Sequence, residues 1–263
     1  MSGDAVVTLA WCWRIERCDG VAIGLTAHDR DLTIDGMVYR AAPGMTPSAI
    51  ERDDSLDPPA LEVGGALSHA AIGEADLLAG RYDGARVVVF AWDWSADGPA
   101  VPLAEGRIGT IETADGSFRA ELLGPEARLE AAVVEATSPA CRATLGDARC
   151  RVVMAGRRRI VRVAAEDGAR LVLPGGGAGC AAGRVRWLTG GNSGLSDMVA
   201  AGDADGVTLA QPPRFAGAGA LVEVTEGCDG TLATCRDRFG NVANFRGEPY
   251  LPGIDLLTRY PVA

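Results

Sequence analysis

The chain has 263 residues, of which 48% are hydrophobic, and its formal net charge is −10. This length suits one large or two modest domains with a real core, and 35 glycines and 14 prolines divide the apolar residues into short pieces. The acidity excludes a sequence-independent nucleic-acid coat, which needs a basic face. All 25 basic residues are arginine.

The first half of the chain is predicted to be rich in strands, because short apolar or alternating runs are separated by Asp-Gly turns. The strands are expected at residues 5–17, 21–26, 32–34, 37–39, 86–94, 105–113 and 117–123. Residues 87–91 are all apolar, which predicts burial on both faces of that strand. Two helices are expected as well, at 68–79 with Ser68 as N-cap and at 125–136.

A domain boundary is predicted at residues 137–140, because Ser138-Pro139 ends the second helix. The expected domains are therefore 1–139 and 140–263. Within the second domain, short strands are expected at 157–164, 169–173, 184–189, 206–210 and 220–225. Strands at this spacing suit a small barrel or sandwich over residues 155–225. The predicted fold class is mainly β (α+β with few helices).

Four cysteines flank this β module in two clips. The first clip is Cys141–Cys150, with eight residues between the cysteines, and the second clip is Cys228–Cys235, with six. The N-terminal residues lack the pattern of a secretory signal, and no apolar run is long enough to span a bilayer. We therefore expect synthesis in the reducing bacterial cytoplasm, where cysteines favour metal ligation over disulfides.

The spacing within the clips is wide for a zinc ribbon, whose ligands usually stand two to four residues apart. A cubane cluster takes one thiolate at each iron from a different direction and tolerates longer loops. Arg142, Arg151 and Arg236 each follow a cysteine and could hydrogen-bond the sulfurs of an anionic cluster. From the residues alone, zinc and iron–sulfur both stay open.

The remaining candidate sites favour structural roles. Cys12 is expected in the core, and Cys18 and Cys180 in turns. In the His28-Asp-Arg-Asp31 stretch, Asp29 and Asp31 are expected to cap a turn between two strands instead of acting in catalysis.

Three other motifs lack the residues that chemistry would need. The Gly175–Gly179 run has no following Lys-Ser/Thr of a phosphate loop, and Asp203–Gly206 lacks the spacing of a calcium loop. No Gly-x-Ser-x-Gly is present. Residues 157–159, all arginine, are expected to be a solvated strand start.

Several stretches resemble the tail-tip or baseplate hub proteins of long-tailed phages and gene transfer agents. They are Trp11–Arg14, Thr26–Gly36, Ser138–Arg142, Leu145–Cys150, Gly227–Asp229, Thr234–Arg236, Phe239–Asn241 and Asn244–Gly247. The resemblance runs from near residue 10 to near residue 253 and is most specific at its C-terminal end. The clip spacing is similar to that of lambda-type tail-tip proteins, whose four cysteines hold a [4Fe–4S] cluster. The ligands implied here are Cys141, Cys150, Cys228 and Cys235.

The resemblance implies a structural protein that catalyses no reaction. Residues 1–139 would form a hub domain and residues 140–263 an iron–sulfur domain. Three copies would surround the tail axis of a phage or gene transfer agent, between the distal tail protein and a large tip or fibre protein. DNA would only pass through the channel, to which the net acidity is suited, and the chain itself would bind no membrane.

Two other classes of function fit the sequence less well than the hub. One is a cytoplasmic iron–sulfur redox or sensor protein, although such proteins usually have close-set ligands, and the chain has no flavin or nicotinamide motif. The other is a cell-wall hydrolase, which the presence of only two histidines disfavours.

Overall fold

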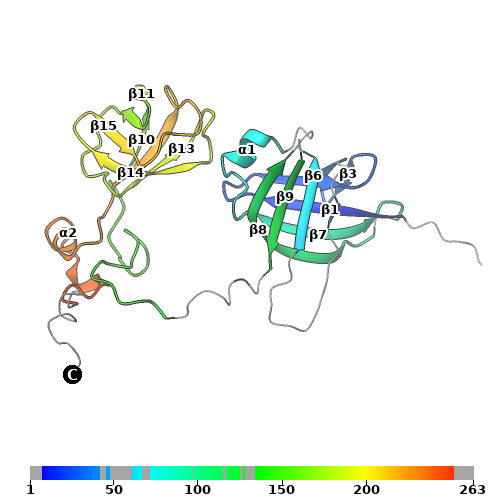
Figure 1. Ribbon diagram of the computed structural model, residues 1–263, viewed down its shortest axis with the longest axis horizontal. Helices are drawn as coiled ribbons and strands as arrows, with labels where there is room; N and C mark the ends of the chain where they lie inside the picture. The colour runs from blue at the N-terminus through cyan, green and yellow to red at the C-terminus, as the bar shows by residue number, and fades with distance from the viewer. Residues whose placement is uncertain are drawn as a thin grey trace, which may run out of the picture. The chain divides into compact units, whose positions relative to one another are not determined.

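The computed structural model describes residues 8–41, 46–47, 61–66, 72–96, 98–114, 117–124, 127 and 134–251. The chain divides into two compact units, unit 1 (Met1–Val133) and unit 2 (Val134–Ala263). The predicted boundary lay at residues 137–140. Strands dominate both units (Figure 1), which confirms the predicted mainly β fold class. In the part of the chain that the structure describes, no helix has the length and apolar character of a membrane span.

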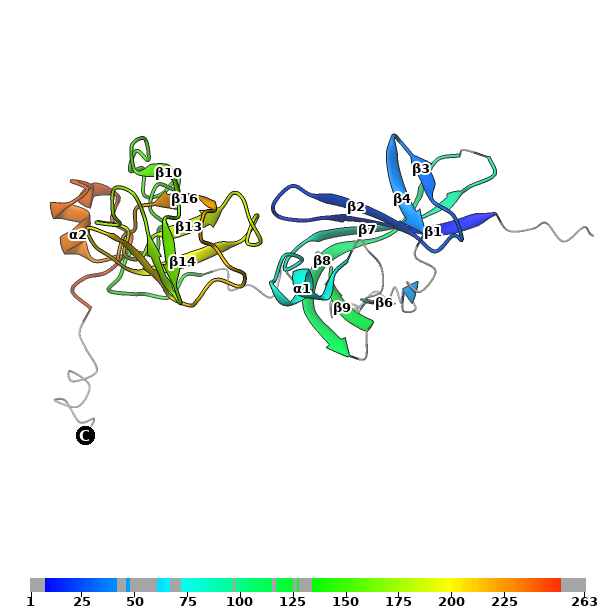
Figure 2. The ribbon, with the colours of Figure 1, turned by 90° about the horizontal axis from the view of Figure 1, so that it is seen from above.

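Unit 1 is built on one nine-stranded sheet, which curves round a hydrophobic core (Figure 2). Its strands are β1 (Leu9–Glu16), β2 (Ala22–Thr26), β3 (Leu32–Ile34), β4 (Met37–Ala41), β5 (Thr46–Pro47), β6 (Leu61–Ala66), β7 (Arg86–Asp93), β8 (Val101–Ala114) and β9 (Ser117–Leu123). Their order across the sheet is β3-β4-β2-β1-β7-β8-β9-β6-β5. The three predicted Asp-Gly hairpins are confirmed, since β1–β2, β3–β4 and β8–β9 pair antiparallel.

The central strand β7 is buried on both faces, as predicted. Val87 and Val89 face the main core, while Phe90 and Trp92 belong to a second cluster on the opposite face. Cys12 is fully buried in this second cluster, as expected. Both faces of the sheet are therefore covered at its centre, where β1 and β7 pair along their whole length.

The main core is covered by one short helix, α1 (Glu74–Leu78), whose Leu77 is buried. The predicted helix at 68–79 was too long, because α1 begins only after Gly73, which adopts an extended conformation. The proposed N-cap, Ser68, lies outside the described residues. So does most of the helix predicted at 125–136.

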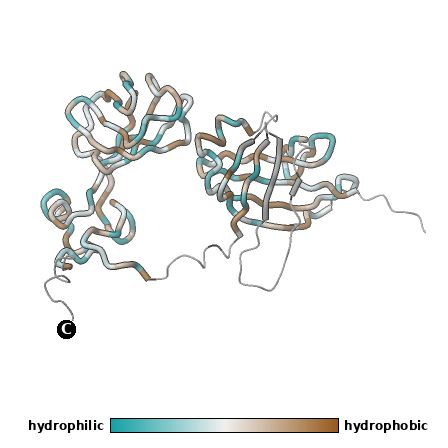
Figure 3. The backbone as a smooth tube through the Cα atoms, viewed as in Figure 1, coloured by the Kyte–Doolittle hydropathy of each residue, from teal (hydrophilic) through white to brown (hydrophobic). Residues whose placement is uncertain are grey.

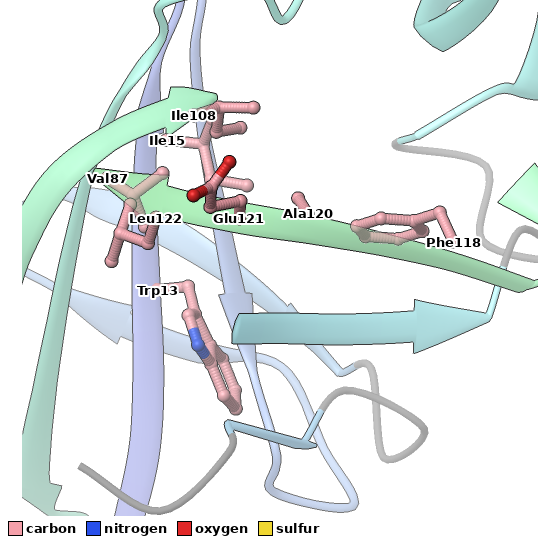
Figure 4. A pocket seen from close by; sticks show the side chains of 8 residues that line it. All are labelled: Trp13, Ile15, Val87, Ile108, Phe118, Ala120, Glu121 and Leu122. Atoms are coloured by element: carbon pink, nitrogen blue, oxygen red, sulfur yellow. The ribbon is translucent and has the colours of Figure 1, made fainter. Parts of the chain in front are cut away.

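A small cavity of about 20 Å³ lies beside the main core (Figure 4). Its lining residues are Trp13, Ile15, Val87, Ile108, Phe118, Ala120, Glu121 and Leu122. The buried Trp13 Nε1 has no hydrogen-bond partner among the described residues. A space of this size holds about one water molecule, so we interpret it as a packing gap and not as a ligand pocket.

Unit 2 contains a seven-stranded module. Its strands are β10 (Arg158–Arg162), β11 (Ala165–Asp167), β12 (Arg170–Val172), β13 (Arg184–Trp187), β14 (Ser196–Gly202), β15 (Gly206–Leu209) and β16 (Leu221–Thr225). Their order is β10-β16-β13-β14-β15-β12-β11. Only Val163 and Ala164 separate β10 from β11, although these strands end opposite sides of the order, so the sheet must curl to bring its edges together.

All five strands predicted for this module are present, and β11 and β14 were missed. The core is a single cluster of buried residues around Trp187, Val185 and Val222. Figure 3 shows the hydrophobic stretches concentrated in strands and the hydrophilic stretches in several loops. The Asp203–Gly206 stretch is a turn in which the Asp203 carboxylate accepts bonds from the Asp205 and Gly206 N–H groups.

Adjacent leucines on α1 provide a test of the core of unit 1. We expect Leu77→Ala to lower the free energy of unfolding of unit 1 by about 2–3 kcal/mol, because its side chain is 6% exposed and leaves a cavity. Leu78→Ala, at 62% exposed, should change it by less than about 0.5 kcal/mol. Urea unfolding followed by tryptophan fluorescence measures both, since four of the five tryptophans lie in unit 1. Equal effects of the two substitutions would contradict this packing.

Candidate metal centre

Three of the four clip cysteines lie in loops of unit 2 and the fourth lies in a helix. Cys141 and Cys150 lie in loops that precede β10, Cys228 follows β16, and Cys235 is buried in helix α2 (Leu232–Asp237). All four are free thiols. The pKa of Cys235 is raised, mainly by burial of its thiol and in addition by the charges of the other three clip cysteines. The four thiols therefore lie near enough to one another to interact electrostatically.

Backbone hydrogen bonds join the first clip to the C-terminal segment. The Cys141 N–H donates to the Gly230 carbonyl at 2.8 Å, and the Arg142 N–H donates to the Arg246 carbonyl at 3.0 Å. Each bond connects residues about 90 or 100 positions apart in the chain. These contacts fix the first clip against the second without any side chain.

A charged clamp reinforces this contact. The Arg142 guanidinium donates to both carboxylate oxygens of Glu248, at 2.6 and 2.8 Å. Glu248 also accepts from the Ser138 N–H at 2.9 Å, and its own N–H donates to the Ser138 carbonyl at 2.8 Å. Bidentate arginine–carboxylate pairs add geometric specificity as well as energy. Arg142 also donates to Glu135, so that it holds two carboxylates at once.

Asn241 touches both clips. Its side-chain amide donates to the Cys150 carbonyl at 2.6 Å and lies 3.7 Å from the Cys150 sulfur. Its backbone N–H donates to the Cys235 carbonyl at 2.9 Å, and Asn244 donates to its side-chain oxygen at 2.7 Å. The orientation of the Asn241 amide is therefore fixed from both sides.

Three of the four sulfurs lie near N–H donors. The Gly230 N–H lies 3.4 Å from the Cys228 sulfur, and the Arg246 N–H lies 3.4 Å from the Cys141 sulfur. The Asn241 amide provides the third contact. Donors of this kind stabilise thiolates and tune metal–sulfur centres. The residues present therefore fit a group that is bound by four thiolates.

The arginines expected to hydrogen-bond the sulfurs bond other groups instead. Arg142 binds carboxylates, Arg236 binds Asp237, and Arg151 donates to a backbone carbonyl. That expectation was wrong, because a guanidinium next to a cysteine in sequence can point away from the sulfur. The N–H donors are Gly230, Asn241 and Arg246, which the sequence had not indicated as donors, although Asn241 and Arg246 lie in the resembling stretches.

The β module brings the two clips close together in space. Its first and last strands pair, and beyond them the Glu226 N–H donates to the Arg157 carbonyl at 3.0 Å. The Arg157 guanidinium binds the Glu226 carboxylate at 2.7 Å. Arg157 and Arg238 both lie over the Phe239 ring, at 5.0 and 4.9 Å from its centroid. The predicted strand start is confirmed, since β10 begins at Arg158, but the Arg157 side chain is half-buried and ion-paired instead of fully solvated.

Two glycines in the resembling stretches permit close backbone contacts. A Cβ at Gly227, just before Cys228, would lie 1.9 Å from the Ala181 carbonyl oxygen. A Cβ at Gly247 would lie 2.6 Å from the Ala140 carbonyl oxygen. A larger residue at either position would push apart segments that position the clips.

The other candidate residues lie away from the clips. His28 to Asp31 join β2 and β3, as predicted, and Asp31 accepts from the Ala41 N–H at 2.8 Å. Asp29 instead contacts His28 at 2.9 Å, and its side chain is 82% exposed. Cys18 is exposed and Cys180 is buried in the module core.

Comparisons with known proteins cover both units. A family model described as the N-terminal attachment domain of a baseplate hub protein matches residues 1–153, which include the first clip. A second model, described as the phage conserved hypothetical protein BR0599, matches residues 180–255, which include the second clip. Among solved structures, a chain from the virion of a native gene transfer agent particle is 37% identical. The match covers 98% of this chain and 93% of that chain, with a TM-score of 0.84. A search of curated proteins found no match.

The Glu248 clamp can be tested in the protein without metal. Arg142 and the Ser138 N–H lower the pKa of Glu248 from 4.5 to about 2. The ionised Glu248 carboxylate therefore stabilises the folded state fully above pH 4.5. This stabilisation should be lost as the pH falls towards about 2 and the carboxylate is protonated. We expect Glu248→Gln to speed hydrogen exchange at the Ser138 and Arg142 amides roughly twofold to fivefold, since exposed ion pairs contribute little each.

The matched control for this experiment is Glu135→Gln, which removes another carboxylate bound to Arg142 but none bound to Ser138. It should leave Ser138 exchange unchanged. Equal acceleration in both variants, or in neither, would be evidence against a specific clamp.

Proposed function

Since the chain belongs to the family of phage baseplate hub proteins, we propose that it joins the end of a tail tube to the peripheral tip proteins. It is a structural protein of the baseplate of a virion-like particle. The observation that carries the proposal is the 37% identity to a gene transfer agent virion chain over 98% of this chain. A match of this length extends through both units and both clips, so the similarity in sequence and fold is not confined to one unit.

The partners follow from this role. Three copies surround the tail axis, with the distal tail protein on one side and a large tip or fibre protein on the other. The description of the matching model over residues 1–153 as an attachment domain supports a docking role for unit 1. DNA only passes through the assembled channel, and the protein catalyses no reaction.

The cofactor of this proposal is a [4Fe–4S] cluster held by Cys141, Cys150, Cys228 and Cys235. Two observations support it: the four cysteines are free thiols, and three of the sulfurs lie near N–H donors. Among the described residues, no three His, Cys, Asp or Glu side chains stand close enough to hold a single metal ion. The spacing of eight and six residues within the clips suits a cubane, which takes one thiolate at each of four irons, better than the alternative, a single zinc.

The cluster serves as a staple in this proposal. When bound, the group cross-links the two clips, and its ligation free energy adds to the folding free energy of unit 2. The chain's own contribution is to bring the thiols together by the backbone bonds and the Glu248 clamp.

Anaerobic purification tests the cofactor. We expect a brown protein with about four irons and four sulfides per chain. Cys228→Ser should lose most of the iron and lower the melting temperature of unit 2. The control Cys18→Ser removes an exposed cysteine outside the clips and should keep the full iron content. A colourless wild-type protein with stoichiometric zinc would refute the cluster, and reversible redox cycling with an unchanged fold in Cys228→Ser would favour the sensor.

Electron microscopy of particles made without this protein tests the hub. We expect tails that fail to assemble or that lack a tip, because the tube end would have no connection to the tip proteins. Expression of the wild-type chain in trans should restore normal tails. If tails remained normal and infective or DNA-delivering in its absence, the hub role would be ruled out.

A further inference from the structure

Charge is strongly segregated between the two units. Residues 1–133 contain 10 arginines and 22 carboxylates, a net charge of −12, while residues 134–263 contain 15 arginines and 13 carboxylates, a net charge of +2. The overall charge of −10 therefore hides an acidic unit 1 and a mildly basic unit 2. Such a chain can attract other copies of itself electrostatically.

Four of the fifteen arginines of unit 2 lie on one side of the β module. We define the arginine face as the outward side chains of β10 and β13, namely Arg158, Arg162, Arg184 and Arg186. These positions are exposed and alternate with more buried neighbours along both strands.

The strand register brings these arginines close together. Arg158 and Arg184 both stand opposite Thr225 of β16, on either side of that strand. Two strand spacings correspond to about 10 Å, so the two rows lie within reach of a single binding partner. Arg186 stands opposite Glu223, the one carboxylate on this face of β16.

These arginines differ from the arginines around the clips. Arg142, Arg157 and Arg238 each bind a carboxylate within unit 2. In the described part of the chain, Arg158, Arg184 and Arg186 have no carboxylate within 4.0 Å. Uncompensated like charges on the two strands that flank β16 repel one another, and carboxylates of a partner would relieve that repulsion.

The rest of the face indicates a protein partner. Ile160 lies between Arg158 and Arg162 and is 63% exposed, and Met198, opposite Arg184, is 52% exposed. Arginine and methionine are enriched in protein interfaces. The strands of this face carry no outward aromatic side chain that could stack on a base, and Glu223 would repel phosphates.

We propose that the arginine face binds the acidic unit 1 of a second copy of this chain. The contact is heterologous, because a basic surface of one copy meets an acidic surface of the next, and such contacts build rings when the rotation closes. The biological setting rests on the proposed hub role, in which several copies assemble, whereas the contact rests on the charges described above.

Sedimentation velocity of the full chain tests this contact. The wild type should self-associate at low salt and dissociate at high salt, since exposed charges are screened. Arg158→Glu with Arg184→Glu should weaken association by at least about tenfold, because the new carboxylates would repel those of the partner. Arg184→Glu alone should weaken it more than the matched control Arg214→Glu, an exposed arginine in the β15–β16 loop. Unchanged circular dichroism spectra would show that the variants fold.

A mixing experiment tests the direction of the contact. The double variant with Arg158→Glu and Arg184→Glu keeps its acidic unit 1, so it should still bind the arginine face of the wild type. The mixed complexes should not grow from the variant's end, because its arginine face is lost. A wild type that is monomeric at every salt and protein concentration would overturn the proposal, as would association that Arg214→Glu weakens equally. Salt-sensitive binding of duplex DNA that the double variant abolishes, without self-association, would assign the face to nucleic acid and also overturn it. Each result differs from a failure of the hub itself, which tail morphology reports.

Discussion

The pairing of β10 with β16 is the constraint on which the proposed site depends. Cys150 and Cys228 are separated by 77 residues, and closing a flexible loop of that length costs about 4 kcal/mol of chain entropy. Here the intervening residues fold into a module whose first and last strands are neighbours. The clips therefore leave the module side by side, and the core of the module offsets the cost of closing the loop.

The contacts around the clips depend on this closeness of the two clips. Once Arg157 and Glu226 are joined, the segment after β16 can form α2 and return towards the first clip. Asn241 and Glu248 then connect this returning segment to Cys150 and Arg142. Beyond α2 the described part of this segment contains one short 3-10 helix (Val242–Asn244), and its polar groups bond to the clips.

Local patterns in the sequence predicted much of the fold. Asp-Gly pairs marked the hairpins, and the apolar run of β7 indicated burial on both faces. Strand β14 was missed because Ser196–Gly202 is poor in β-branched and aromatic residues and is held by its neighbours β13 and β15. The convergence of the clips was expected from the resemblance, but the roles of Asn241 and Glu248 were not. Both depend on bonds across about 90 residues or more, which no local pattern reveals.

The role of an arginine in this protein depends on its position and cannot be inferred from the amino-acid composition. In a chain without lysine, the same side chain serves two purposes in unit 2. Near the clips its planar fork binds carboxylates and ring faces, where geometry matters more than charge. On the arginine face it forms no ion pair with any residue that the structure describes, and there it contributes to the electrostatic potential of the surface. The net charge of −10 excludes a nucleic-acid coat for the chain as a whole, yet it says nothing of one sheet face, where four positive charges surround one carboxylate.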